Sequence, residues 1–496
     1  MHHSLPSTDR VSEPHSQWIE ARSTLKTLWG YDHFRSPQGE IIQGLLQGTD
    51  TLVVMPTGSG KSLCFQLPAL LQQGLTVVVS PLVALMENQV RDLQQRRLSA
   101  ALLHSGVSKQ KRSRLFWQIQ HQKIRLLYVS PETLLSQKLW DQLNQPQVLI
   151  NGLILDEAHC LVQWGDTFRP VYRRLGQVRE ALLKTQPNGQ PMAIAAFTAT
   201  ADPQAQSVIE SVLKLRNPYT VLLNPYRKNL HLNVQWVWTP QGRRSRLLKW
   251  IKSRPKQPGL IYVRSRRQAT ELAQWLTDQG CRAAAYHAGL GTHVRRHVES
   301  DWLRGDIPVV VCTSAFGMGI DKPDCRWVIQ YQAPTLLSEY VQEVGRAGRD
   351  GHEAIALTFV SEPTGWLDNY DKRHRQFIRD QHRKSWQKAQ QLIPKLPQEG
   401  NVQAISRKFK EGAIALSLLH SHGQLTWADP FHYQIHRQER KRSNLPQTIN
   451  QGISQMEKFL HTRQCRWQFI LNAFGFGADA KKLGEGCGGC DRCSQR

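Results

Sequence analysis

A glycine-rich loop between a buried strand and an apolar helix limits this chain to one broad class of fold. The run MPTGSGKS overlaps the end of the apolar segment Thr51–Met55 and leads into the apolar segment Leu63–Leu71. In this context Gly58 and Gly60 let the backbone close around a phosphate, and the start of the helix supplies positive potential. The order strand, phosphate loop, helix predicts an α/β domain with a parallel sheet.

Two sets of short apolar runs alternate with amphipathic stretches, as buried parallel strands do. The runs of the first set are Thr51–Met55, Leu75–Val79, Ile124–Val129, Gly152–Leu155 and Ala193–Phe197, and those of the second are Gly259–Val263, Ala283–His287, Val309–Thr313, Trp327–Tyr331 and Ala354–Val360. They predict two doubly wound parallel-sheet lobes, residues 18–222 and 223–362, with a cleft between them. Asn224–Val234 is the expected hinge. The polar residues 1–17 are expected to form a disordered arm without an export signal.

The phosphate loop and a DEAH run at 156–159 together predict an ATP and Mg²⁺ site. Residues 57–62 form the loop, in which Thr57 and Ser59 flank the glycines, Lys61 reaches the β- and γ-phosphates and Ser62 holds Mg²⁺. Asp156 ends a strand and is expected to hold Mg²⁺ through water, and Glu157 to activate the attacking water. DEAH alone would also suit an ordinary acidic strand end.

The second lobe carries QEVGRAGRDG after a predicted helix. An arginine pointing across the cleft can neutralise charge on the transferring phosphoryl group, so Arg346 and Arg349 are predicted to do this. Gln342 lies one turn earlier and is assigned to the same site. The alternative is that both arginines lie on the surface.

Four cysteines near the C-terminus have the spacing of a metal site. Cys487, Cys490 and Cys493 are separated by two residues each, and Cys465 lies one helix upstream. Such thiolates can converge on one tetrahedral Zn²⁺. An iron–sulfur cluster or four unpaired thiols are the alternatives. The five other cysteines are scattered, which suits a reducing cytoplasm.

The charge balance points to a polyanionic partner. The chain has 64 Lys and Arg against 39 Asp and Glu, a net charge of +25, and nucleic acid is the simplest partner. A generally basic surface is the alternative. No apolar run reaches the ~18 residues that a membrane span needs.

Residues 363–446 form a basic segment with a predicted α+β core. Two short helices are followed by the runs QLTW and FHYQIH, which read as two strands, and helices followed by a strand hairpin are the order of a winged helix. An irregular helical linker is the alternative. A helical hairpin, Gln447–Ala473, leads into the cysteines, so residues 447–496 are predicted to form a zinc module.

With these motifs in place the chain resembles the RecQ family of DNA helicases, within helicase superfamily two. The similarity covers roughly residues 29–360 and 447–493, and includes GYDHFRSPQ, VVVSPLVALMENQV, AFTATA, VCTSAFGMGIDKPD and QWGDTFRPVY. It implies that both lobes are RecA-like and that the chain moves 3′ to 5′ on single-stranded DNA. It also implies that Tyr31 and Arg35 sandwich the adenine while Gln38 binds its edge. The replacement of the first loop glycine by Met55 is a known kind of variation in helicases.

By the same resemblance QWGDTFRPVY is an aromatic-rich loop that couples DNA binding to hydrolysis. Trp164, Phe168 and Arg169 match it residue by residue, and ring faces with a guanidinium suit sequence-tolerant stacking on bases. A packed aromatic corner is the alternative. His159, Thr198 and Thr200 are expected to relay between nucleotide and DNA.

The chain departs from the family pattern in several places. Asp166-Thr167 stand where the family usually has His-Asp, and Asp321 stands where Asn is common. The basic segment before Gln447 is an insertion, and only Ser-Gln-Arg follows Cys493, so the family's later winged helix and helical domain are not expected. The insert is predicted to supply a displaced winged helix that grips duplex DNA.

The resulting expectation is an ATP-, Mg²⁺- and zinc-dependent DNA helicase of recombination and repair in the cytoplasm. Its expected partners are single-stranded and forked duplex DNA, a single-stranded-DNA-binding protein is a candidate, and its oligomeric state is open. One rival is an RNA helicase. The other is a DNA-stimulated ATPase that anneals strands and unwinds weakly.

Overall fold

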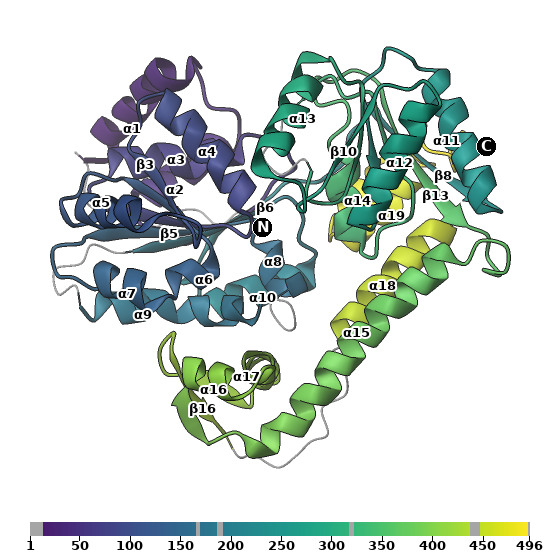
Figure 1. The fold of residues 1–496 in the computed structure, drawn as a ribbon. Coiled ribbons are helices and arrows are strands. Elements are labelled where there is room, and N and C mark those ends of the chain that lie inside the picture. The colour runs from purple at the N-terminus through teal and green to yellow at the C-terminus, as the bar shows by residue number, and fades with distance from the viewer. Residues whose placement is uncertain (1–12, 165–168, 186–191, 317–321, 437–446, 495–496) are drawn as a thin grey trace.

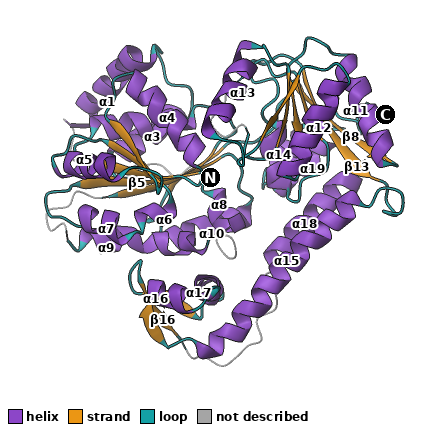
Figure 2. Ribbon diagram, viewed as in Figure 1, coloured by secondary structure: helices purple, strands orange, loops and turns teal. Residues whose placement is uncertain are grey.

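The chain folds into two parallel-sheet lobes with a helical arm that reaches back beneath the first lobe (Figure 1). The structure, a computed structural model, describes residues 13–164, 169–185, 192–316, 322–436 and 447–494. Helices cover both faces of each sheet (Figure 2), so the predicted α/β class with two doubly wound lobes is confirmed. Within the described residues no helix is both long enough and apolar enough to cross a membrane.

The first lobe is built on a seven-stranded parallel sheet. Its order is β3 (Ala100–Leu103), β4 (Leu126–Val129), β2 (Leu75–Val79), β5 (Ile150–Asp156), β6 (Ala193–Thr198), β1 (Thr51–Val54) and β7 (Tyr219–Leu222). Alternate residues of one strand enter opposite cores: Val77 and Val79 pack on one face and Val78 on the other. Burial on both faces explains why the central strands read as continuous apolar runs.

The helices of the first lobe follow its strands in the doubly wound manner. They are α1 (Glu13–Thr24), the π-helical turn η1 (Leu25–Trp29), α2 (Gln38–Leu46), α3 (Lys61–Leu71), α4 (Val83–Gln95), α5 (Lys109–Gln120), α6 (Pro131–Leu134), α7 (Gln137–Leu143), α8 (His159–Trp164), the 3-10 helix η2 (Pro170–Gln177), α9 (Val178–Leu183) and α10 (Pro203–Leu213). The expected disordered arm through residue 17 is too long, because α1 already begins at Glu13. This helix is held by Ala21, which is fully buried in a small core with Leu25 and Leu67.

The second lobe repeats the design with six parallel strands. Their order is β10 (Ala283–Tyr286), β11 (Val309–Cys312), β9 (Gly259–Tyr262), β12 (Trp327–Gln330), β13 (Ala354–Ser361) and β8 (Leu230–Val237), and the helices are α11 (Pro240–Lys252), α12 (Arg266–Asp278), α13 (Thr292–Arg304) and α14 (Leu337–Val344). Strand β8 was not predicted. It occupies the last five residues of the expected hinge Asn224–Val234, so the segment outside the sheets ends at Asn229.

The basic insert is a folded unit rather than an irregular linker. Its elements are α15 (Tyr370–Leu392), the 3-10 turn η3 (Ile393–Lys395), β14 (Glu399–Asn401), α16 (Val402–Lys408), α17 (Gly412–Ser421), β15 (Leu425–Trp427) and β16 (His432–Ile435). The strands form an antiparallel sheet in the order β14-β16-β15, and they enclose a core that includes Ile405, Leu416 and Tyr433. This order of helices and strands is the one that a winged helix has.

The last unit returns along the arm to the second lobe. Helix α18 (Gln447–His461) runs beside α15 (Figure 1), and Glu457 of α18 receives ion pairs from Arg375 at 2.9 Å and Arg379 at 3.4 Å. Helices α19 (Arg466–Ala473) and α20 (Gly477–Lys482) follow and lead to the cysteines. The insert therefore interrupts a helical hairpin that starts and ends at the second lobe.

Candidate ATP site and zinc centre

The phosphate loop connects β1 to α3 in the conformation that its glycines permit. Gly58 and Gly60 both have positive φ, 84° and 79°, which other residues adopt at a cost. Lys61 begins α3, and its Nζ donates to the carbonyl of Met55 at 2.9 Å. Burial lowers the pKa of this ammonium, and the Glu157 and Asp156 carboxylates oppose that shift. The lysine is thus held across the loop, next to both acidic residues.

Asp156 ends β5 and is held from two sides. Its Oδ2 accepts from Gln89 Nε2 at 3.2 Å and its Oδ1 from the Glu157 backbone N–H at 3.0 Å. Burial raises the pKa of Asp156, and the charge of Glu157 raises it further. A divalent cation would stabilise the ionised form of such a carboxyl group, so Asp156 fits the predicted Mg²⁺ role, with Ser62 at the start of α3 as the other predicted ligand.

The neighbours of Glu157 lower its pKa although its side chain is largely buried. Burial opposes its ionisation, but the hydrogen bond and charge of His159 and the charges of Lys61 and Arg346 outweigh that effect and lower its pKa. Its Oε2 lies 3.3 Å from Nδ1 of His159. The residue has φ 55°, a left-handed conformation at the strand end that turns the chain sharply into α8.

His159 connects Glu157 to the second lobe. Nδ1 of His159 lies 3.1 Å from Thr198 Oγ1, and the amide of Gln342 on α14 lies 3.2 Å from Nε2. Thr198 Oγ1 in turn donates to the carbonyl of Thr200 at 3.1 Å. Five of the residues assigned from sequence to catalysis and relay therefore form one continuous chain of contacts across the lobes.

Both predicted arginines of the second lobe approach the phosphate loop. The side chain of Arg349 packs on Gly58, where an added Cβ would meet its Cδ at 3.3 Å. The charges of Arg349 and Arg346 act on Lys61, and that of Arg346 acts on Glu157. Both arginines are half-buried rather than fully exposed on the surface, and their role in hydrolysis stays a prediction.

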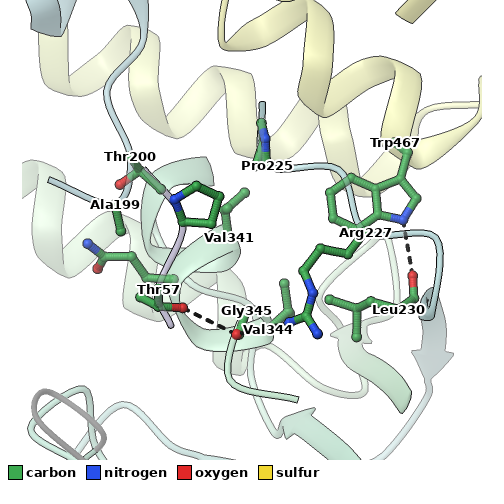
Figure 3. A pocket seen from close by; sticks show the side chains of 12 residues that line it. Thr57, Ala199, Thr200, Pro225, Arg227, Leu230, Val341, Val344, Gly345 and Trp467 are labelled. Atoms are coloured by element: carbon green, nitrogen blue, oxygen red, sulfur yellow. Dashed lines mark hydrogen bonds between the residues drawn. The ribbon is translucent and has the colours of Figure 1, made fainter. Parts of the chain in front are cut away.

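A pocket beside the phosphate loop brings together four parts of the chain. Thr57 and Thr200 line it from the first lobe, Arg227 from the connecting segment, Gly345 from the second lobe and Trp467 from α19 (Figure 3). Thr57 Oγ1 donates to the carbonyl of Gly345 at 3.2 Å. The end of α14 is thus bonded directly to the phosphate loop.

The adenine-side residues are placed less completely. Gln38 is buried, accepts from the backbone N–H of Arg35 at 3.0 Å and donates to the carbonyl of Ser59 at 3.0 Å. It therefore links the segment before α2 to the phosphate loop. Tyr31 is 53% exposed, as a ring that awaits a stacking partner would be; its contact with adenine, like that of Arg35, stays a prediction.

The aromatic-rich loop lies largely outside the described residues. This holds for Asp166, Thr167 and Phe168, and for Asp321 in the second lobe. The backbone of Trp164 ends α8. Arg169 is described: its Nη1 donates to the carbonyl of Pro81 at 2.7 Å, and its Nε lies 3.6 Å from Glu132. The guanidinium thus joins two loops at the ends of β2 and β4, and its contact with DNA stays a prediction.

Three residues that support the site were not found from sequence. Gln89 binds Asp156 from α4, and Arg227 donates to the carbonyl of Ala347 at 2.7 Å. Arg264 forms a two-pronged pair with Glu343 at 2.8 and 2.9 Å. Arg227 and Arg264 fix α14 and the turn after it, which carry Gln342, Arg346 and Arg349.

The four predicted cysteines converge at the C-terminal end. Their Sγ atoms all lie within 4.8 Å of one another, with pairs at 3.5, 3.9 and 4.0 Å. Zn–S bonds of about 2.3 Å in a tetrahedron place the sulfurs roughly 3.8 Å apart. A cubane iron–sulfur cluster binds each thiolate to a different iron, which needs wider spacing. The cluster of Cys465, Cys487, Cys490 and Cys493 is compatible with one Zn²⁺.

Backbone groups around the thiolates also suit a metal. Backbone N–H groups of Arg466 and Cys487 point at the sulfurs of Cys490 and Cys465, at 3.5 and 3.3 Å. An added Cβ at Gly486 would lie 2.5 Å from Cys493 Sγ, so only glycine lets the backbone approach. The buried Arg466 pairs with Asp491 at 2.8 Å and joins the two halves of the module.

The cysteine module is bonded to β8 and to the segment before it. Trp467 Nε1 donates to the carbonyl of Leu230 at 3.1 Å (Figure 3), and the Asp491 N–H donates to that of Leu232 at 3.0 Å. Asn224 Nδ2 donates to Asp479 at 3.0 Å. The module therefore braces β8 and the residues before it.

Known families match both lobes. Residues 35–208 match the DEAD/DEAH box helicase family, and residues 242–351 match the helicase conserved C-terminal domain. Among solved structures, the DEAD-box helicase Mss116 bound to ssRNA and UDP-BeF superposes with a TM-score of 0.58 at 17% identity over 72% of this chain and 77% of that chain. Mycobacterium smegmatis helicase Lhr bound to ssDNA and AMP-PNP gives 0.54 at 18% identity, over 90% and 62%. These two likenesses show the fold.

Relatives in sequence are more specific. The chain is 39% identical over 366 residues to the ATP-dependent DNA helicase Q5 of Rattus norvegicus, an alignment that covers 71% of this chain and 37% of that protein. It is 51% identical over 469 residues to the ATP-dependent DNA helicase RecQ of a Synechocystis species, which covers 95% of this chain and 97% of that protein. With its two helicase lobes and this identity over nearly its full length, the chain belongs to the RecQ family of DNA helicases.

Proposed function

We propose that this chain is an ATP- and Mg²⁺-dependent DNA helicase that moves 3′ to 5′ along single-stranded DNA and unwinds duplex DNA in recombination and repair. The observation that carries the proposal is the contact chain from Glu157 through His159 to Gln342, together with Arg349 on the phosphate loop. Both lobes meet at the place where ATP is expected, so hydrolysis there can move one lobe against the other. Membership of the RecQ family supports DNA as the substrate.

Each residue of the site has a distinct task in this mechanism. Lys61 binds the β- and γ-phosphates, and Ser62 and Asp156 hold Mg²⁺, which would neutralise phosphate charge when bound. Glu157, kept ionised by its neighbours, orients and activates the attacking water. Arg346 and Arg349 stabilise the charge that develops on the transferred phosphoryl group.

DNA binding is coupled to the site through neighbouring loops. His159, Thr198 and Thr200 connect Glu157 to the loop after β6, and Arg169 contacts Pro81 after β2 and Glu132 after β4. Trp164 and Phe168 are proposed to stack on bases of the bound strand. Zn²⁺ held by the four cysteines would stabilise the module that is bonded to β8 and to the residues before it.

The insert is proposed to be a winged helix that grips duplex DNA through cations of α15. Lys372, Arg373 and Lys384 are exposed, whereas Arg440, which is proposed to join them in this grip, lies outside the described residues. Helix α17, by contrast, is apolar and mostly buried. In other winged helices the helix at this position would enter the DNA groove. Because α17 is mostly buried here, the proposed duplex contacts come from α15 and not from α17.

A strand-annealing DNA-stimulated ATPase with weak unwinding remains the second candidate. The turn between β15 and β16 packs on the first lobe, since Arg174 donates to the carbonyl of Pro430 at 3.0 Å. A hairpin held in this way does not project as a strand-separating wedge.

An RNA helicase is disfavoured by the RecQ relationship. A single-stranded-DNA-binding protein as partner, and a place in the cytoplasm or nucleoid, belong to the proposal as well.

The test uses two variants of the ATP site. Lys61→Ala removes the phosphate-binding charge and Glu157→Gln the water-activating carboxylate, so each should reduce DNA-stimulated ATPase activity by about 10³-fold or more. Glu157→Gln should still bind ATP and DNA. Substantial hydrolysis by either variant would refute the site assignment. Unwinding of 3′-tailed but not 5′-tailed duplexes by the wild-type protein would establish the polarity, and ATPase without unwinding would favour the annealing candidate.

A further inference from the structure

Three exposed aromatic side chains gather at one edge of the second lobe. Trp366 is 86% exposed, Trp238 57% and Tyr370 38%. Trp238 follows β8 directly, and the Glu362 N–H after β13 donates to the carbonyl of Val237, the last residue of β8, at 3.0 Å. Because β8 and β13 are neighbouring parallel strands, both tryptophans leave the sheet at adjacent strand ends. Tyr370 begins α15 four residues after Trp366.

The loop that carries Trp366 is firmly held. The carboxylate of Glu362 accepts hydrogen bonds from the backbone N–H groups of Thr364 at 2.6 Å, of Trp366, and of Leu367 at 3.0 Å. Arg243, buried in the first turns of α11, binds Asp368 at 2.9 Å. A fixed backbone therefore presents the indole ring to solvent. Exposed apolar surface of this kind often marks an interaction site.

Cations dominate the exposed charges of the segments around these rings. Between residues 362 and 373 the carboxylates of Glu362, Asp368 and Asp371 are 3%, 2% and 4% exposed, whereas Lys372 and Arg373 are exposed. Helix α11, which starts beside the loop, has no acidic residue and exposes four cations, Arg244, Arg246, Lys249 and Lys252. On α12, which Tyr370 contacts through Gln268, the exposed Glu271 is paired with Arg267. A surface of ring faces on which cations outnumber carboxylates suits a polyanion with stackable groups.

This surface lies at the same edge of the second sheet as the start of helix α14, which belongs to the motor site. All strands of the second sheet are parallel, so their carboxyl ends share one edge. Helix α14, with Gln342, follows the end of β12 at that edge. The loop between β13 and α15 projects at the right-hand side of the second lobe in Figure 1, on the way from the motor to the insert.

We propose that Trp366, Trp238 and Tyr370, with the exposed Arg244 and Arg246 of α11, form a stacking platform for single-stranded DNA next to the motor lobes. The inference rests on the proposed function, since it takes DNA as the substrate. The rings stack on unpaired bases, and the cations bind the phosphates between them. Duplex DNA hides its base faces, so a single strand, either the tracking strand beyond the lobes or the displaced strand, is the fitting ligand.

Binding of fluorescent oligo-dT strands of increasing length tests this site. Trp366→Ala and the double variant Trp238→Ala/Trp366→Ala should bind strands of about 30 nucleotides about tenfold more weakly than the wild-type protein, whereas strands of about 8 nucleotides, filled by the lobes alone, should lose less. Trp366→Phe keeps a ring and should retain most of the affinity. Trp117→Ala is the matched control, because Trp117 is 52% exposed on α5 of the other lobe.

The outcomes separate this platform from the proposed function. Stimulation of the wild-type ATPase by single-stranded DNA establishes the motor independently of Trp366. Equal affinities of wild-type and Trp366→Ala proteins at every length would overturn the platform and leave the surface to a protein partner. An equal loss in Trp117→Ala would also overturn it, because the effect would then belong to any exposed tryptophan.

Discussion

Gln342 joins the two lobes at the proposed site of hydrolysis. Its amide contacts His159, and His159 contacts both Glu157 and Thr198. Because Glu157 is proposed to activate water, the arrangement lets the position of the second lobe influence that carboxylate. A typical hydrogen bond contributes about 0.5–1.5 kcal/mol, enough to matter for the rate.

Substitution of Gln342 tests this link at the scale of one residue. Gln342→Ala should reduce DNA-stimulated kcat about tenfold, because the contact with the His159–Glu157 pair is lost. The affinity for a fluorescent ATP analogue should fall less, since Lys61 and the phosphate loop remain. Gln274→Ala, an exposed glutamine on α12 of the same lobe, is the control. A larger effect on nucleotide affinity than on kcat would place Gln342 in ATP binding instead.

At the scale of elements, the strands buried along their whole length were the most predictable. Strands β2, β4 and β5 are of this kind, and their apolar runs were found. Strands β3 and β7 lie at sheet edges, are only partly buried and were missed, although β10, a partly buried edge strand as well, was found. Strand β8 alternates buried and less buried residues in LHLNVQWV, a period-two pattern that was read as a hinge.

Site residues were predictable where a motif sets their spacing. Lys61, Asp156 and the four cysteines have local signatures, and the structure brings each group together. Gln89 and Arg227 act through contacts between segments distant in sequence, which no local pattern records. The same limit applies to the insert, whose core was foreseen but whose contact with the first lobe was not.

The cysteine module can be tested as an element. Cys490 is fully buried, so Cys490→Ala should abolish zinc binding, and structural zinc contributes about 10 kcal/mol or more to small folds. Elemental analysis should find one zinc per wild-type chain and almost none in the variant. Hydrogen exchange should rise in α19, α20 and the bonded residues of β8. Cys281→Ala, outside the cluster, is the control; iron in the wild-type protein, or zinc retained in the variant, would contradict the assignment.

At the scale of the whole molecule, the insert forms a second connection between the two lobes. Helix α15 leaves the second lobe, and its far end enters the insert core through Trp386 and Ala389. The insert then meets the first lobe, where Phe431 packs edge-on against Trp140 at 5.2 Å and is 8% exposed. Any movement of one lobe against the other must therefore break this contact or bend α15.

Phe431→Ala should release the insert from the first lobe. Loss of a large buried ring from a core costs about 3–5 kcal/mol of stability. Phe431 packs on the first lobe rather than in the core of the insert. The substitution should therefore weaken the contact between the insert and the first lobe, and not the fold of the insert. Hydrogen exchange should increase in η2 and α17, which face each other, while the insert core keeps its protection. ATP turnover without DNA should rise, because the lobes are no longer joined through the insert.

Phe377→Ala, on the exposed side of α15, is the control. Unchanged exchange in η2 would show that the contact does not hold the insert, and unchanged turnover despite increased exchange would show that this connection does not restrain the motor.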